Sequence, residues 1–143
     1  MLRMILPILL ILWPLAAPAW VAGRVGVVCT LTNDAGDVVL THDPTGPIYT
    51  ITVAHGEAWP DAEIFGIAFQ GAEALTITTD RHVRSADGRA ITVTDRGFGN
   101  VLAGLSRNLT ATAFAGPASV GFSLAGAAPA VAIFETCDAP PTA

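Results

Sequence analysis

The stretch YTITV, residues 49–53, alternates large apolar side chains with threonines. Successive side chains of a β-strand point to opposite faces of the sheet, so this period of two residues is typical of a strand with one buried face. Tyr49, Ile51 and Val53 are then expected to point inward, and the two threonines outward. β-Branched and aromatic residues also favour strands. The stretch therefore predicts a half-buried strand.

The same alternation recurs on both sides of this stretch, and a further short strand is expected over residues 38–41. The other inward rows are expected to be Val25, Val27, Cys29 and Leu31; Phe65, Ile67 and Phe69; Leu75 and Ile77; Ile91 and Val93; and Val120, Phe122 and Leu124. Repeated short strands of this kind are typical of an all-β domain.

Turn signals separate these strands. Asn, Asp, Gly and Pro gather at residues 33–37 and 43–47, where their backbone preferences favour turns. Asp87 and Gly88 predict a hairpin turn between the two strands that flank them. The pattern predicts a single domain over residues 20–138, an antiparallel β-sandwich or flattened barrel with a short C-terminal helix.

Two segments have helical rather than strand-like spacing. Residues 100–108 predict one or two helical turns. Residues 129–137 predict the more regular helix, with Pro129 in the first helical position, where its missing N–H costs nothing. One face of this helix is expected to contain Ala130, Ile133, Phe134 and Cys137. We expect the helix to pack across one end or one face of the strands.

The N-terminus has the features of a secretion signal. Arg3 precedes an apolar run, MILPILLILW, and the small residues Ala17 and Ala19 predict a cut before Trp20. A retained membrane anchor is the alternative, but the run has roughly ten residues whereas a span needs about 20. Residues 1–19 are therefore expected to be a cleaved signal peptide of a periplasmic or secreted protein. Residues 139–143 are expected to be a disordered tail.

The two cysteines, Cys29 and Cys137, lie near the two ends of the expected mature chain. A pair of cysteines in a small exported domain indicates a disulfide, because the compartment is oxidising. Both are expected to face the same core, one from a strand and one from a helix. Two free thiols, or half of a metal site, are the alternative interpretation.

Charge excludes one class of partner. The chain of 143 residues has seven basic residues, all arginine, against 12 acidic residues, for a net charge of −5. Proteins that bind nucleic acid present a basic surface to the phosphates. We therefore expect no nucleic-acid partner, and no membrane span after the signal is removed.

Two segments carry a resemblance to known proteins. The ending VGFSLAGAAPAVAIFETC, residues 120–137, resembles that of small periplasmic proteins of alphaproteobacteria, including the invasion-associated locus B type. The stretch TDRHVRSADGRAITVTDRGFGNVLAGL, residues 79–105, resembles uncharacterised small exported proteins of the Rhodobacterales type, some of which are labelled excinuclease subunits. The resemblance implies a periplasmic address and a cell-envelope role, and it transfers no catalytic residue. The excinuclease label is excluded, because such an ATPase needs a phosphate-binding lysine and the chain has none.

Two sets of residues could carry catalysis. His42, His55 and His82 could together hold zinc, but they lie 13 and 27 residues apart and match no zinc motif. Asp80, His82 and Ser85 are the residue types of a hydrolytic triad, without the nucleophile elbow. The alternative interpretation is that all of them are ordinary strand-end or loop residues.

A cluster of arginines is the main candidate binding feature. Arg81, Arg84, Arg89 and Arg96 fall in one predicted hairpin, where 81 with 89, or 84 with 96, could converge on an anionic ligand or a partner. The alternative is a charged edge hairpin whose arginines pair with Asp80, Asp87 and Asp95. Trp59, in a predicted loop, is either an exposed contact residue or part of the core edge.

These observations favour a non-catalytic binding or interaction module of the cell envelope, with no cofactor and no metal. Its partner is expected to be an envelope protein or an anionic ligand. The alternative is a small secreted hydrolase or metal-dependent enzyme that uses Asp80 and His82, or the three histidines. An enzyme should show a pocket with convergent polar groups, and a binding module a patch that exposes Trp59 or the arginines.

Overall fold

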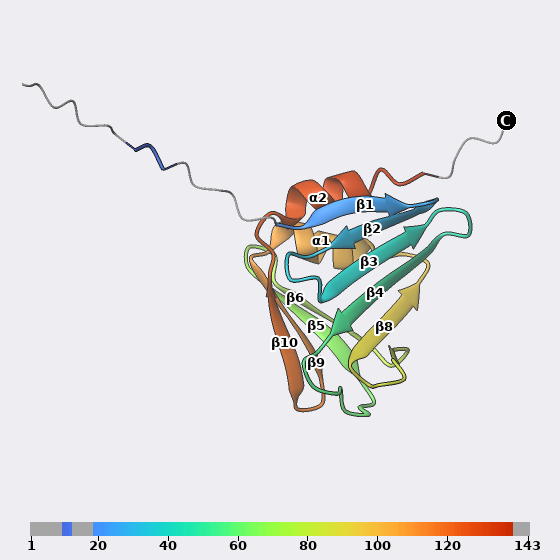
Figure 1. Ribbon diagram of the computed structural model, residues 1–143. Coiled ribbons are helices and arrows are strands. Elements are labelled where there is room, and N and C mark those ends of the chain that lie inside the picture. Colours follow the sequence, from blue (N-terminus) through green and yellow to red (C-terminus); the bar gives the residue numbers. More distant parts are fainter. Residues whose placement is uncertain (1–9, 13–18, 139–143) are drawn as a thin grey trace, which may run out of the picture.

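The computed structural model describes residues 10–12 and 19–138. From Trp20 onward the chain forms two antiparallel β-sheets that face each other, with two helices at one end (Figure 1). Most of the predicted signal peptide and the whole predicted tail, residues 139–143, lie outside the described residues. Within the described residues, no helix is long and apolar enough to cross a bilayer.

The first sheet has six strands, all paired antiparallel. In spatial order they are β1 (Val21–Val25), β2 (Val28–Thr32), β3 (Val38–Asp43), β4 (Ile48–Ala54), β8 (Ala90–Asp95) and β7 (Val83–Arg84). The stretch at residues 49–53 is the centre of β4, as the alternation predicts. It lies between β3 and β8, with Ile51 opposite Leu40 on one side and Val93 on the other.

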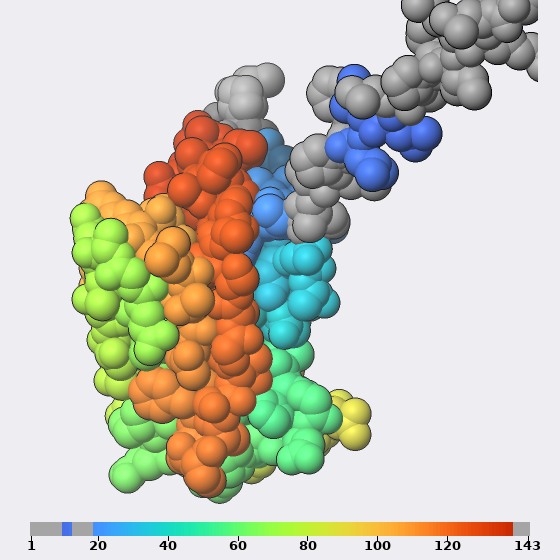
Figure 2. All heavy atoms as spheres, turned by 90° about the vertical axis from the view of Figure 1, so that its left-hand side faces the viewer, coloured from blue at the N-terminus to red at the C-terminus, as the bar shows by residue number. Residues whose placement is uncertain are grey.

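The second sheet has four strands and is also antiparallel. Its order is β10 (Ala118–Ser123), β9 (Thr110–Ala115), β5 (Phe65–Gln70) and β6 (Leu75–Thr79). The predicted sandwich is confirmed, and it is not a closed barrel. On the side that carries β10, atoms of the two sheets lie directly against each other (Figure 2). At the opposite side of the sandwich, β7 is the edge strand of the first sheet and β6 is the edge strand of the second.

The core lies between the sheets and follows the predicted inward rows. The buried side chains include Leu31, Val38, Leu40, Ile51, Val53 and Ile91 from the first sheet, and Phe65, Ile67, Phe69, Ala111 and Ala113 from the second. Trp20, at the start of the domain, is buried in the core, and its indole N–H donates to the Ser123 carbonyl at 3.0 Å. Small alanines on β9 lie beside the large rings of β5 in register, Phe69 opposite Ala111.

The prediction of one strand through residues 25–31 was wrong. The segment is a hairpin, in which Val25 pairs with Val28 across a two-residue turn at Gly26. Gly26 has φ +60°, a conformation that glycine adopts without steric cost. As a result Val25 is 73% exposed and Val27 is also exposed, whereas Leu31, after the turn, is buried as expected.

The hairpin turn predicted at Asp87 and Gly88 is present, but the prediction that it joins the strand at residues 75–78 to the strand at residues 91–94 was wrong. Their turn joins β7 to β8, while β6 belongs to the second sheet. The chain crosses between the sheets at residues 80–82. Strand β9 was not predicted, because its sequence TATAFA alternates threonine with alanine and offers little contrast in hydrophobicity.

Two helices, α1 (Gly99–Arg107) and α2 (Ala127–Phe134), cover one end of the sandwich (Figure 1). The C-terminal helix is present, but it begins two residues before Pro129 and is the shorter of the two, with eight residues against nine. Its buried face is formed by Ala127, Ala130, Val131 and Phe134. Ile133 is 62% exposed, so its predicted inward position was wrong.

The predicted disulfide is confirmed. Cys29 and Cys137 are bonded, with their Cα atoms 6.1 Å apart and a separation of 108 positions in the sequence. Cys29 faces the core from β2, and Cys137 lies three residues beyond the end of α2. The bond therefore holds the segment after α2 against the first sheet, next to the contacts that α2 makes with β1 and β2.

Candidate functional site: a cleft between the sheets

A cleft opens between the sheets on the side of β6 and β8, with a volume of about 460 Å³. It exists because β7 pairs only with Ile91 and Thr92, so the outer edge of β8 has no further partner among the described strands. Across the opening, β6 is the last strand of the second sheet. The volume lies within the range of about 300–1,000 Å³ of small-molecule sites. We call this space the intersheet cleft.

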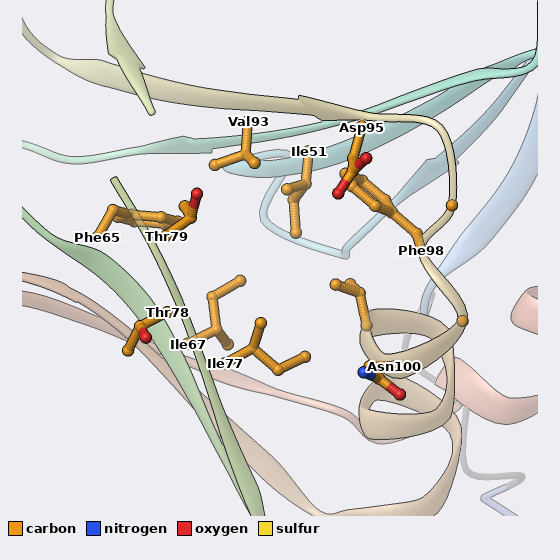
Figure 3. Close-up of a pocket in the computed structure, with 13 residues that line it drawn as sticks. Ile51, Phe65, Ile67, Ile77, Thr78, Thr79, Val93, Asp95, Phe98 and Asn100 are labelled. Carbon is orange, nitrogen blue, oxygen red and sulfur yellow. The ribbon is translucent and has the colours of Figure 1, made fainter. Parts of the chain in front are cut away.

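The walls of the intersheet cleft are apolar. Ile51 and Val93 project into it from the first sheet, and Phe65, Ile67 and Ile77 from the second (Figure 3). The period-two pattern explains this arrangement, because these side chains belong to the inward rows of β4, β8, β5 and β6. They are the same kind of residue as the core, at the place where the two layers are not closed by a further strand.

Polar groups gather at one end of the cleft, where β8 passes into α1. The lining residues there are Asp95, Gly97, Phe98, Gly99, Asn100 and Val101, and the hydroxyl-bearing Thr78 and Thr79 lie on β6. Asp95 is the last residue of β8, and its Oδ1 accepts the backbone N–H of Arg96 at 2.7 Å. Phe98 is the N-cap of α1 and provides no side-chain cap. We call this end the mouth.

A cross-strand row links the mouth to the disulfide. On neighbouring strands, Cys29 pairs with His42, His42 with Tyr49, and Tyr49 with Asp95. The four side chains share one face of the first sheet, because directly paired residues of an antiparallel sheet lie on the same face. Tyr49 also contacts Phe98, with ring centroids 5.5 Å apart.

The four arginines do not line the cleft, and Arg84 and Arg96 are not brought together. All four are exposed. Arg84 lies opposite Ile91 on β8, five residues from Arg96, which corresponds to about 17 Å along a strand. Arg84 Nη1 instead donates to the Trp59 carbonyl at 3.1 Å. Among the described residues the single ion pair joins Arg107 to Glu73, so the proposed pairing of Asp80, Asp87 and Asp95 with the arginines is not seen.

Trp59 belongs to the core. Its side chain is 1% exposed, and its indole N–H donates to the Val53 carbonyl at 3.2 Å. Its ring lies edge-on to Phe65, at 5.9 Å between centroids. Trp59 is therefore not available as an exposed contact residue, and of the two interpretations of this loop tryptophan the core one holds.

The three histidines lie in separate environments. His42 is buried against Tyr49 and Phe134. His55 contacts the ring of Trp59, and His82 contacts the ring of Phe65. Over residues 10–12 and 19–138, no three His, Cys, Asp or Glu side chains are placed so that they could share a metal ion.

The proposed triad residues do not interact with one another. His82 Nε2 is hydrogen-bonded to the Ala62 carbonyl at 2.8 Å, and Ser85 donates its hydroxyl to Asp87 at 2.7 Å. The Nδ1 atom of His82 is buried without a hydrogen-bond partner. A triad needs its base hydrogen-bonded to both other members, and this arrangement does not provide that.

Two carboxyl groups have a pKa below the ordinary value, one at the end of β3 and one in the turn before β8, and both lie away from the cleft lining. The hydroxyl of Thr45, followed by its backbone N–H, lowers the pKa of Asp43. The backbone N–H of Arg89, followed by the hydroxyl of Ser85, lowers the pKa of Asp87. Both are local turn hydrogen bonds that stabilise the ionised carboxylate, so they need no catalytic explanation.

Sequence reasoning missed the cleft and the position of Asp95. A signal was present, because Ile91, Val93 and Asp95 continue one period-two row. A carboxylate at the end of an inward row is unusual, since charged side chains seldom face a core. The short β7 could not be foreseen from the same pattern, and the opening of the cleft depends on it.

Comparison of the chain with protein-family models, with curated proteins and with solved structures finds no match. The function of the cleft must therefore be inferred from its own geometry and chemistry.

Proposed function

We propose that this protein is a non-catalytic binding module of the bacterial cell envelope, periplasmic or secreted, that holds the apolar part of a small ligand in the intersheet cleft. The observation that carries the proposal is the cleft itself, about 460 Å³ of space with apolar walls and a polar mouth. Small-molecule sites have this combination of a largely apolar surface and a few placed polar groups. The signal-like N-terminus, the disulfide and the resemblance to exported proteins support the location.

Burial energetics favour a ligand in this space. Ile77 and Val93 are only partly buried, although they belong to the inward rows. Each 100 Å² of apolar surface removed from water contributes about 2.5 kcal/mol. A ligand that covers Ile77 and Val93 would remove from water apolar surface that the sandwich alone leaves exposed.

The opening is maintained by local structure. The hydrogen bond between His82 and the Ala62 carbonyl directs the segment before β7 toward residues 60–64 instead of along β8. The turn after Arg84 then reverses the chain, with Gly88 N–H donating to the Ser85 carbonyl at 2.9 Å. A longer β7 would pair with the rest of β8, so these contacts keep that edge free.

The polar groups of the mouth suit orientation of a ligand better than catalysis. Asp95 is an exposed carboxylate, and no histidine, cysteine, serine or arginine lines the cleft. Acid–base or nucleophilic catalysis needs such groups within hydrogen-bond reach of one another. The hydrolase alternative has no geometric support, because within the described residues no hydrogen bond joins Asp80 to His82.

Binding of N-phenyl-1-naphthylamine, a neutral apolar dye whose fluorescence rises in apolar surroundings, tests the proposal. Ile77→Phe places a larger side chain in the cleft. Thr76→Phe, one residue earlier on β6, places the same ring on the exposed outer face and is the matched control. We expect saturable binding by the native protein and by the control, and a severalfold weaker affinity for Ile77→Phe. Absence of saturable binding by the native protein refutes the proposal.

A further inference from the structure

We infer that the ligand of the intersheet cleft carries a positively charged head group, an ammonium or a similar cation, which lies beside Asp95 while its apolar body fills the cleft. This inference rests on the proposed function and adds the chemical class of the ligand. It also revises the expected partner, because the sequence analysis expected an envelope protein or an anionic ligand.

Asp95 is the one charged side chain among the lining residues. It ends the inward row of Ile91 and Val93, and Figure 3 shows its carboxylate directed toward the cleft beside the ring of Phe98. The apolar walls lower the local dielectric, which strengthens the interaction of this charge with a ligand that excludes water. A charge at one end of an apolar site fixes the orientation of an amphipathic ligand.

Within the described residues, no arginine forms an ion pair with this carboxylate. Within residues 19–138 the single ion pair, between Arg107 and Glu73, does not involve it. Arg96 follows it in the chain but does not line the cleft. Among the described residues, Asp95 accepts one hydrogen bond, from the backbone N–H of Arg96 to Oδ1. A carboxylate accepts several hydrogen bonds, so it retains capacity for a donor on the ligand.

The N-terminus of α1 also lies at the mouth, and its partial positive charge opposes the negative charge of Asp95. The relative size of these two charges decides whether the mouth prefers a cation or an anion. A helix N-terminus is equivalent to about +0.5 elementary charge, whereas an ionised carboxylate is a full negative charge. The mouth therefore retains a negative excess. The face of an aromatic ring also attracts a nearby cation, and Phe98 lies at this end of the cleft. An anionic head group would face the full charge of Asp95 with only the partial positive charge of the α1 N-terminus to offset it.

Three probes with the same twelve-carbon body test this inference at pH 7: dodecylammonium and dodecanoate below their micelle concentrations, and dodecan-1-ol below its solubility limit. Each is titrated against protein that already carries N-phenyl-1-naphthylamine. We expect dodecylammonium to displace the dye at about two- to fivefold lower concentration than dodecanol, the range for a partly exposed ion pair. Dodecanoate should be the weakest competitor.

Asp95→Asn should remove the advantage of dodecylammonium over dodecanol, with the affinity for the dye measured separately for each variant. Asp34→Asn is the matched control, because it makes the same change in net charge at an exposed turn outside the cleft. In the native protein the advantage should also shrink between 20 mM and 500 mM salt, through screening. The salt measurement keeps the test decisive if the Asp95 variant does not fold.

The possible outcomes separate the two proposals. Equal displacement by dodecylammonium and dodecanol, or stronger displacement by dodecanoate, overturns the cationic head group while dye binding still supports the cleft. An advantage that persists in Asp95→Asn, or at high salt, also overturns it. If the native protein binds neither the dye nor any twelve-carbon probe, the proposed function itself is overturned, and the head-group inference fails with it.

Discussion

The imidazole of His42 lies flat against the ring of Tyr49, with centroids 3.9 Å apart and planes inclined by 3°. The two residues are a directly opposed pair on β3 and β4. On one side of the stack His42 pairs with Cys29 of the disulfide, and on the other Tyr49 pairs with Asp95. The stack thus joins the disulfide to the mouth of the cleft.

We expect His42→Ala to lower the free energy of unfolding by about 2–3 kcal/mol. The buried imidazole would leave a cavity, and the stacked pair itself is worth about 0.5–1.5 kcal/mol. His42→Phe keeps an aromatic ring and should lose less than half as much. Urea unfolding followed by circular dichroism measures both variants. A loss below about 0.5 kcal/mol for His42→Ala would show that the stack contributes little.

The disulfide should be the strongest single contribution to stability. In the chain-entropy model, closing a loop of about 100 residues stabilises a protein by about 4.7 kcal/mol. We expect the Cys29→Ser/Cys137→Ser double variant to lose about 3–5 kcal/mol and to match the reduced native protein. Unfolding curves with and without reductant make the comparison. A reductant effect that persists in the double variant would contradict this assignment, because its cysteines are absent.

Two glycines differ in what a methyl group would meet. A Cβ at Gly104 on α1 would lie 2.6 Å from the ring of Phe69, which is buried in the core. A Cβ at Gly66 would lie 2.4 Å from the tip of Phe114, which is only partly buried and can swing away. Phe69, the neighbour of Gly104, is held in place by the core, whereas Phe114, the neighbour of Gly66, can move.

We expect Gly104→Ala to destabilise the protein by about 1–2 kcal/mol, because overpacking costs about 1–3 kcal/mol and exceeds the gain of up to about 1 kcal/mol in helix propensity. Gly66→Ala should cost less than about 1 kcal/mol. Thermal or urea unfolding ranks the two. The reverse order would indicate that α1 can move away from β5 more easily than Phe114 can rotate.

The alternation of side chains predicted most of the sandwich, because burial of one sheet face imposes it directly on the sequence. The row Tyr49, Ile51 and Val53 and the row Phe65, Ile67 and Phe69 lie where the pattern places them. The pattern failed at Gly26, where a two-residue turn interrupts an apparently continuous row. A period of two says which side chains share a face but not where one strand ends.

The site was less predictable for a related reason. Sheet membership depends on pairing over long sequence distances, and the crossing at residues 80–82 leaves no periodic signal. The segment was therefore interpreted as one hairpin with clustered arginines, whereas its chain runs between two sheets. Asp95 appeared in that interpretation as a counter-ion to arginine. Its place at the mouth follows from β8 joining β4, which the local sequence does not specify.

The carboxyl of Asp87 should make stability depend on pH in the acid range. Hydrogen bonds from the backbone of Arg89 and the hydroxyl of Ser85 lower its pKa below 3.8 in the folded protein. A lowered pKa means that the stabilisation is complete above the unfolded-state pKa and is lost as pH falls through the folded-state pKa. The stability gap between the native protein and Asp87→Asn should stay constant from pH 7 to 5 and narrow below pH 4.

Carboxyl titration by NMR checks this assignment residue by residue. Ser85→Ala removes the side-chain donor, so it should raise the pKa of Asp87 toward 3.8 and leave that of Asp43 unchanged, since Asp43 depends on Thr45. An ordinary pKa for Asp87 in the native protein would contradict the proposed cause. So would a stability difference between the native protein and Asp87→Asn that grows as the pH falls.

The last prediction concerns the arginines, which sequence analysis placed in one candidate site. Arg84→Gln removes the hydrogen bond to the Trp59 carbonyl and should cost about 1 kcal/mol, the typical net value for such a bond. Arg96→Gln, at an exposed position, should change stability by less than about 0.5 kcal/mol. Neither residue lines the cleft, so the double variant should bind N-phenyl-1-naphthylamine with unchanged affinity and keep any partner captured from an envelope extract. Its solubility should fall, because the edge of the first sheet loses two charges. Loss of dye or partner binding with unchanged stability would reverse this view, and the arginines would then belong to the binding site.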